Sequence, residues 1–168
     1  MPWIPDIIWA SPPCTEYSRA KARGVRNLEL ADKLVAKFIE IRDHFLELNP
    51  SMLWFCENGE TMLWDREVAK TLCPRVHLSY CQYGRPYRKN TIIATNAVWD
   101  PAPKKCNPKT CAMIVDGVHL FTAQQGPSRM KGISRKEDVC SRDMLHSIPE
   151  QLCEEIYEVC LKIQWEVV

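Results

Sequence analysis

The sequence contains little of what a secreted or membrane-bound protein requires. Its 168 residues begin without the basic region and apolar stretch of a signal peptide. No apolar run approaches the ~20 residues of a membrane-spanning helix. Glycine is scarce, with six residues and no Gly-x-Gly, and the net charge of +1 gives the whole chain no attraction to nucleic acid or lipid. We therefore expect an intracellular protein, in the cytoplasm or the nucleus, that has no membrane partner and binds anions only at local basic clusters.

The composition is that of an ordinary folded domain. Hydrophobic residues make up 46% and charged residues 26% of the chain, which suits a sizeable core and argues against disorder. The nine cysteines are odd in number and scattered, in a chain long enough to fold without disulfides. We expect mostly reduced thiols, as in an intracellular compartment, and a single domain over residues 1–168.

The first half of the chain alternates between apolar runs and helical periodicity. Residues 4–10 predict a short buried strand, residues 28–48 a helix that Asn27 can cap, and residues 52–56 a second buried strand. A strand–helix–strand unit of this kind implies parallel strands joined by a right-handed crossover. A short helix is expected next, over residues 61–72.

Two further strands are predicted over residues 76–81 and 91–95, close enough in sequence to form an antiparallel pair. Periodicity then fails from residue 96 to residue 146, where proline, glycine and lysine dominate. A segment this long without regular structure is unusual unless it is functional or held by something else. Helical spacing returns over residues 147–165. We expect an α/β fold with a core of residues 1–95, an irregular segment and a C-terminal helix.

Candidate catalytic residues follow two of the predicted strands. Cys14 lies in the stretch SPPCTEYS, where two prolines stiffen the loop that follows the first strand. Glu57 and Asn58 follow the second strand. The carboxyl ends of strands are where ligands gather in open α/β sheets. The structural alternatives are that Cys14 is a small buried side chain, as most free cysteines are, and that Glu57 is a capping or surface carboxylate.

Three stretches stand in a fixed order: SPPCTEYS at residues 11–18, Glu-Asn at residues 57–58, and Gln-Tyr-Gly at residues 82–84 with basic residues after it. In this order they resemble the DNA cytosine-5 methyltransferases, above all the compact forms of phages and large viruses. The resemblance covers roughly the whole chain and implies a partial Rossmann-like methyltransferase sheet. It also implies that Cys14 adds to carbon 6 of a cytosine extruded from double-stranded DNA. Glu57 would contact the ring nitrogen beside the amino group, and S-adenosylmethionine would supply the methyl group.

The resemblance assigns roles to other residues as well. Ser11 and Pro12 would border the cofactor. The residues expected to contact the substrate are Pro13, Ser18, Asn58, Arg88 and Lys89. The residues expected to hold phosphates are Arg19, Lys21, Arg23, Arg85, Arg88 and Lys89. A solvated surface loop is the alternative for the basic residues that follow the cysteine loop.

The chain departs from the family in three places. The family opens with a glycine-rich strand–turn–helix that cradles S-adenosylmethionine, and this sequence starts at what would be the fourth strand. Asn90 and Ile92 stand where the family has two arginines, and Glu57-Asn58 is followed by glycine rather than valine or proline. Three explanations fit: a split enzyme whose second protein chain carries the cofactor motifs, a truncated chain, or an inactive binding or structural subunit of a larger assembly.

The irregular segment contains a possible metal-ligand set. Three cysteines and one histidine there could hold a structural zinc ion, which would explain order without periodicity. These residues are Cys106, Cys111, His119 and Cys140. Their spacing matches no common zinc finger, so unrelated thiols and a surface histidine are the alternative.

Two other enzyme classes also use a cysteine in their active site. A zinc deaminase requires His-x-Glu ahead of Pro-Cys-x-x-Cys, and position 17 is Tyr17 with no such histidine upstream, so this class is excluded. A hydrolase that pairs Cys14 with a histidine stays open, because nothing in the sequence selects one histidine over another. The candidates are His44, His77, His119 and His146.

Overall fold

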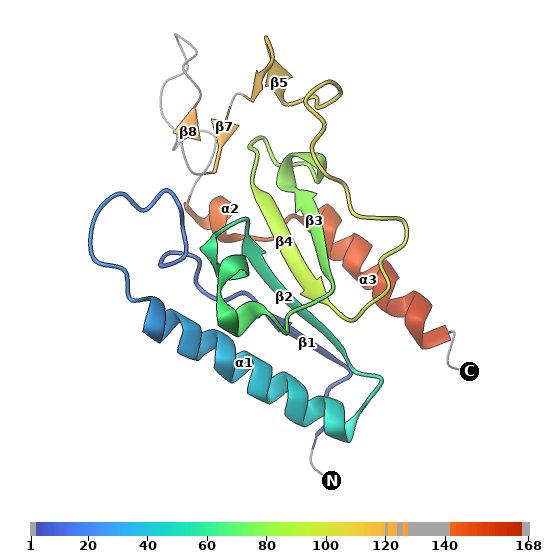
Figure 1. The fold of residues 1–168 in the computed structure, drawn as a ribbon. Coiled ribbons are helices and arrows are strands. Elements are labelled where there is room, and N and C mark those ends of the chain that lie inside the picture. The colour runs from blue at the N-terminus through green and yellow to red at the C-terminus, as the bar shows by residue number, and fades with distance from the viewer. Residues whose placement is uncertain (1–2, 120, 124–125, 128–141, 166–168) are drawn as a thin grey trace. The chain divides into compact units, whose positions relative to one another are not determined.

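The protein is described here by a computed structural model that covers residues 3–119, 121–123, 126–127 and 142–165. It is a mixed α/β fold with a mixed sheet and a C-terminal helix, as the sequence predicts (Figure 1). The chain divides into two compact units. Unit 1 comprises Met1–Val76 and Ile92–Val98, and unit 2 comprises His77–Thr91 and Trp99–Val168. Within the described residues, no helix is long and apolar enough to cross a membrane.

Unit 1 begins with the predicted strand–helix–strand unit. Strand β1 (Ile7–Ala10) pairs in parallel with β2 (Leu53–Gly59), and α1 (Leu28–Leu48) connects them. The side chain of Asn27 caps α1 by accepting a hydrogen bond from the backbone N–H of Leu30 at 3.0 Å. The local signals of the sequence therefore place this helix correctly at both ends.

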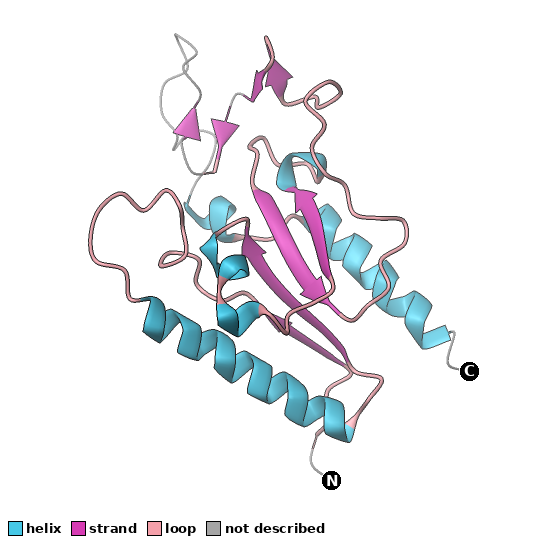
Figure 2. Cartoon of the chain, viewed as in Figure 1, coloured by secondary structure: helices cyan, strands magenta, loops and turns pink. Residues whose placement is uncertain are grey.

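The four-stranded sheet has the order β1-β2-β4-β3, with β3 at Arg75–Ser79 and β4 at Asn90–Thr95. The backbone N–H of Thr95 donates to the carbonyl of Pro74 at 3.1 Å, and that of Tyr80 to the carbonyl of Lys89 at 3.0 Å. Residue numbers that rise on one strand as they fall on the other define an antiparallel pair. Figure 2 shows the two arrows pointing in opposite directions. The predicted antiparallel pair is confirmed.

The prediction that residues 4–10 form a buried strand is wrong in length and in burial. Strand β1 covers four residues at the edge of the described sheet. Ile7 is 44% exposed and Trp9 37% exposed, and the ring of Trp9 stacks on Phe55 at 5.7 Å between centroids. An apolar run is equally compatible with a central strand and an edge strand, because the run itself does not show which strands pair with it or which elements cover its faces.

Residues 61–72 were expected to form one short helix but form two 3-10 turns, η1 (Met62–Asp65) and η2 (Glu67–Ala69). Arg66 between them has extended backbone torsion angles, and its guanidinium binds the carboxylate of Asp32 on α1. This tertiary contact accompanies the break in the helix. The core of unit 1 packs α1 and these turns against β2 and β4. Its buried members are Tyr17, Ala31, Val35, Trp54, Cys56, Leu63, Trp64, Ala69, Leu72, Ile92 and Ala94.

Unit 2 contains the irregular segment and only short elements within it. After η3 (Tyr80–Gln82) come a hairpin of β5 (Ile114–Val115) and β6 (Val118–His119), then β7 (Phe121–Thr122) paired with β8 (Gly126–Pro127). The hairpin turns through Asp116 and Gly117, whose φ angles are 49° and 78°. Positive φ at both central residues is the geometry of a tight hairpin turn, and it favours Asp-Gly.

The C-terminal helix α3 (Glu150–Trp165) confirms the prediction over residues 147–165, and α2 (Arg142–His146) precedes it. Leu152, Val159 and Cys160 form the buried face of α3. Glu155 binds the helix to the rest of unit 2, because one carboxylate oxygen accepts from the Tyr83 hydroxyl at 3.0 Å and from the Trp99 indole at 2.9 Å.

Candidate functional site

The carboxyl ends of β1 and β2 carry the residues expected to act on a substrate. Ala10 lies opposite Cys56 in the parallel pair, so the residues that follow each strand emerge at the same edge. Cys14 lies four residues beyond the end of β1, and Glu57 and Asn58 lie within β2, next to its C-terminal residue Gly59. The thiol of Cys14 is exposed, whereas Glu57 is only 6% exposed.

The side-chain amide of Asn58 connects the two strand ends. Asn58 is 1% exposed. Its Nδ2 donates to the backbone carbonyl of Pro12 at 2.7 Å, and its Oδ1 accepts from the hydroxyl of Thr61 at 3.0 Å. A buried amide with both ends satisfied fixes the groups it contacts, because breaking either bond leaves a polar atom without water. Asn58 therefore holds the loop of Cys14 against the end of β2.

The loop is also held on its far side, through Tyr17. The ring of Tyr17 is fully buried, its hydroxyl donates to Asp32 at 2.9 Å, and its carbonyl accepts from the backbone N–H of Met62 at 3.0 Å. Burial, followed by the hydrogen bond to Asp32, raises the pKa of Tyr17. The hydrogen bond from Arg66 is the largest effect that lowers the pKa of Asp32, so this carboxylate stays charged at neutral pH. Cys14 is thus an exposed thiol on a loop anchored at both ends.

A second cysteine, Cys56, lies near this edge but is unsuited to react. Burial is the main cause that raises the pKa of Cys56 to about 12, with a smaller contribution from the charge of Glu57. Because the thiolate is the reactive form, Cys56 remains a protonated core side chain at neutral pH. Cys14 is therefore the accessible thiol at this edge.

Two of the basic residues after the cysteine loop, Lys21 and Arg26, bind the loop itself. Lys21 donates to both carboxylate oxygens of Glu16 at 2.7 Å, which is the largest cause of the lowered pKa of Glu16. Arg26 donates to the carbonyls of Glu16 and Ser18 at 2.8 Å. Arg19 makes an exposed ion pair with Asp65. These contacts give the charges a structural role, whereas contact with phosphate stays a prediction.

The remaining predicted residues of this loop make local contacts. The hydroxyl of Ser11 accepts from the indole N–H of Trp9 at 2.8 Å, and that of Ser18 from the backbone N–H of Ala20 at 3.3 Å. Pro13 is exposed, and Pro12 contributes the carbonyl that Asn58 binds. The assignment of Ser11 and Pro12 to a cofactor, and of Pro13 and Ser18 to a substrate, stays a prediction.

Arg88 and Lys89 belong to unit 2. Lys89 donates to the carbonyl of Leu145 at 3.3 Å and lies over the ring of Tyr80, 4.6 Å from its centroid. Arg85, also expected at phosphate, donates to the hydroxyl of Ser147 at 2.7 Å and to the carbonyl of Ile148 at 3.1 Å. The side chain of Arg88 is exposed. Lys89 and Arg85 thus bind the segment around α2, and their roles toward a substrate stay predictions.

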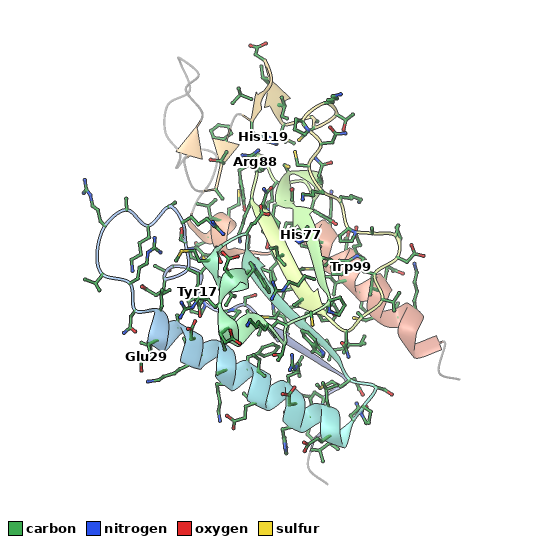
Figure 3. All side chains as sticks on the ribbon, in the orientation of Figure 1. Tyr17, Glu29, His77, Arg88, Trp99 and His119 are labelled. Atoms are coloured by element: carbon green, nitrogen blue, oxygen red, sulfur yellow. The ribbon has the colours of Figure 1, made fainter. Side chains whose placement is uncertain are left out.

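Unit 2 contains a second candidate site, a group of three cysteines and one histidine. Cys81 from η3, Cys106 and Cys111 from the irregular segment, and His119 from β6 offer ligand atoms that all lie within 4.8 Å of one another. The Nε2 atom of His119 lies 3.3 Å from the sulfur of Cys106 and 3.4 Å from that of Cys111. Figure 3 labels His119 in this region. Such a donor set allows a zinc ion.

Three of the four predicted ligands therefore come together. Cys140 lies outside the described residues, and Cys81, which is not among the predicted ligands, takes part. The sequence predicts a strand over residues 76–81, in which Cys81 is an apolar side chain of the sheet. Cys81 lies far before Cys106 in the sequence, at no known metal-binding spacing, so no local signal could have identified it.

Replacing Asn58 with alanine is expected to lower the free energy of unfolding by about 2–3 kcal/mol, because the carbonyl of Pro12 and the hydroxyl of Thr61 lose a buried partner. Amide hydrogen exchange of the Cys14 loop should become faster. The matched control is Thr61→Val. This variant removes the hydrogen bond from Thr61 to Asn58 but keeps the hydrogen bond from Asn58 to the carbonyl of Pro12. If the amides of the Cys14 loop exchange equally fast in both variants, Asn58 does not anchor the loop.

Two candidate sites thus emerge: in unit 1 an exposed thiol on the loop after β1 with a buried carboxyl group at the end of β2, and in unit 2 a group of potential metal ligands. Comparison of the chain with protein-family models gives no match, and comparison with curated proteins gives none either.

Proposed function

We propose that the chain carries the residues of a DNA cytosine-5 methyltransferase that act on the cytosine, with Cys14 as the nucleophile and Glu57 as the acid. The observation that carries the proposal is the anchoring of the Cys14 loop to the end of β2 through Asn58. It brings an exposed thiol and a shielded carboxyl group to the same edge of one parallel strand pair. The resemblance of the SPPCTEYS and Glu-Asn stretches supports the same assignment.

The fold supports the proposal at the level of topology. Strand β1, helix α1 and strand β2 form a unit with parallel strands, and the candidate residues Cys14 and Glu57 lie toward the carboxyl ends of these strands. Such a unit is expected in a Rossmann-like methyltransferase sheet. We assign β1 to the strand that precedes the nucleophile loop in that family.

The proposed reaction requires a nucleophile because carbon 5 of cytosine is unreactive in the aromatic ring. The Cys14 thiolate forms a bond to carbon 6, and the electron pair of the 5,6 double bond moves into the ring toward the nitrogen beside the amino group. Glu57 stabilises the charge that develops at this nitrogen by hydrogen bonding. Carbon 5 is now enamine-like and takes an electrophile. Loss of the original proton from carbon 5 and release of the thiolate then restore the double bond.

Double-stranded DNA is the proposed substrate, with the target base extruded from the stack, since a thiol in a loop cannot reach carbon 6 inside a duplex. S-adenosylmethionine supplies an electrophilic methyl group in such chemistry. The described residues do not fit this cofactor: the segment after β1 is Ser-Pro-Pro-Cys, and the described glycines with positive φ, at positions 24, 84 and 117, do not form a strand–turn–helix cradle. The proposal is therefore limited to the cytosine, with the donor site assigned to residues outside this sequence, on a second protein chain or on a missing N-terminal part.

Exchange of the hydrogen at carbon 5 tests this proposal without a methyl donor. In deuterated buffer, addition of the thiolate lets carbon 5 accept a deuteron, and loss of the original proton with release of the thiolate leaves deuterated cytosine. We expect an excess of the full chain to introduce deuterium into the deoxycytidine of a synthetic duplex, measured by mass spectrometry of the digested nucleosides. Thymidine, whose carbon 5 carries a methyl group, is the internal control.

The same measurement is made with single-stranded DNA. If the chain does not accelerate deuterium exchange at carbon 5 of cytosine in either substrate, relative to DNA alone, the proposal is contradicted. That outcome would favour the alternative of an inactive methyltransferase-derived subunit that binds DNA or supports a larger assembly.

A further inference from the structure

Unit 2 places four soft or borderline ligand atoms around one point. The donors come from three separate parts of the chain: Cys81 from η3, Cys106 and Cys111 from the segment between Lys104 and β5, and His119 from β6. Cys81, Cys111 and His119 are buried, with exposed fractions of 6%, 7% and 5%. A shared ligand would explain why buried thiols and a buried imidazole from distant positions in the sequence lie together.

We propose that Cys81, Cys106, Cys111 and His119 bind one zinc ion that organises the irregular segment of unit 2. Two of the distances within the group, both from His119, fit this ion. Ligands of a tetrahedral zinc, at about 2.3 Å for sulfur and about 2.0 Å for nitrogen, lie about 3.5 Å apart. The Nε2 atom of His119 lies 3.3 and 3.4 Å from the sulfur atoms of Cys106 and Cys111. Nε2 is thus the ligating nitrogen.

The chemistry of the donors selects zinc over other common ions. Calcium and magnesium prefer oxygen ligands, and none of the four donors is oxygen. Three thiolates with one imidazole are a frequent structural zinc set. All four coordination positions are filled by protein, which leaves none for a water or a substrate. The ion is therefore structural and takes no part in the reaction at Cys14.

Two neighbouring side chains complete the centre. The amide Nε2 of Gln82 donates to the sulfur of Cys111 at 3.3 Å and approaches that of Cys81 at 3.8 Å. Three thiolates leave the zinc centre with one net negative charge. Arg88, labelled in Figure 3, lies close enough to Cys106 and His119 to act on both electrostatically, and it supplies the opposite charge. Such outer partners stabilise metal–thiolate centres.

The local backbone supports a structural ion. Between Cys106 and His119 the chain has little regular structure: a turn in which the N–H of Cys111 donates to the carbonyl of Asn107 at 3.0 Å, and the two-residue strands β5 and β6. Exposed Val115 and Val118 contribute little to a core. A bound ion replaces the hydrophobic packing that this segment lacks.

The test is the metal content of the full chain, purified under reducing conditions and measured by elemental analysis. We expect one zinc per chain, and a cobalt-substituted protein with the absorption of tetrahedral thiolate coordination. His119→Ala should lose the metal and this absorption. His119→Cys should keep both, because four thiolates also form a zinc site; retention in this variant shows that a folded centre is being measured.

The ligand set is tested by Cys81→Ser against Cys160→Ser, a buried cysteine of α3 away from the centre. Loss of zinc only in Cys81→Ser supports the assignment. Metal-free wild-type protein with all thiols reduced, a disulfide within the group, or full zinc retention in Cys81→Ser would overturn it. None of these readouts depends on Cys14, so failure here leaves the exchange experiment unaffected, and the converse also holds.

Discussion

Replacing Cys14 with serine is expected to abolish deuterium exchange at carbon 5 of cytosine, with a loss of at least ~100-fold that leaves only the rate of DNA alone. At neutral pH a few per cent of an ordinary thiol is ionised and strongly nucleophilic, whereas a serine hydroxyl without a general base is not. Because Cys14 is exposed and serine is nearly isosteric, the unfolding temperature should not change.

The matched control is Cys73→Ser. Cys73 is also an exposed cysteine of unit 1, but it lies beyond η2, away from the carboxyl ends of β1 and β2. Exchange by this variant should equal that of the wild type. If Cys14→Ser retains exchange, or if Cys73→Ser loses it, Cys14 is not the nucleophile.

A second variant separates the two proposed roles. Glu57→Gln keeps a hydrogen-bonding side chain of the same size but cannot exchange a proton with the ring. Slower exchange with normal binding of the duplex is expected for a group that stabilises charge, whereas weaker binding alone would indicate a structural carboxylate.

The elements governed by short-range signals could be predicted from the sequence. The cap at Asn27, the helical spacing from Leu28 and the end of the pattern at Asn49 all depend on neighbours in the chain, and α1 forms where these signals place it. The antiparallel pair of β3 and β4 has the same origin, because a short connection leaves few alternatives.

Burial could not be predicted in the same way. Leu34, Ile41 and Leu48 recur at helical spacing with Val35, yet these three are exposed and the buried residues of α1 are Ala31, Val35 and Arg42. Arg42 is buried because its guanidinium lies over the ring of Trp54, 4.8 Å from the centroid, and donates to the carbonyl of Thr71. Such partners come from distant segments, so periodicity identifies a helix but not the face that is covered.

The role of Asn58 shows a similar limit. The sequence places it beside Glu57 at a strand end, and the resemblance assigns it to the substrate. The structure shows both ends of its amide bound to protein, at Pro12 and Thr61. Its position was therefore predicted, but its partners depend on the pairing of β1 with β2. The hairpin of β5 and β6, by contrast, has a local signal, because Asp116-Gly117 is typical of a tight hairpin turn.

Zinc removal should have the largest effect on the structure of unit 2. When a chelator strips the ion from the reduced chain, we expect amide hydrogen exchange between Cys106 and His119 to accelerate by at least ~100-fold, because the segment loses the four bonds that connect it. The amides of Cys111 and Ile114, which donate to the carbonyls of Asn107 and Cys111, are the reporters. Mass spectrometry of peptic fragments measures this.

Unit 1 provides the internal control for this experiment. Amides of α1 donate within the helix, and its buried face packs in the core of unit 1, so their protection should not change when zinc is removed. Addition of zinc should restore protection in the wild type but not in Cys81→Ser. If residues 106–119 stay protected without metal, their order comes from packing and the thiol–imidazole contacts alone, and zinc does not organise the segment. If α1 also loses protection, the ion stabilises the whole chain, and a separate structural role in unit 2 is contradicted.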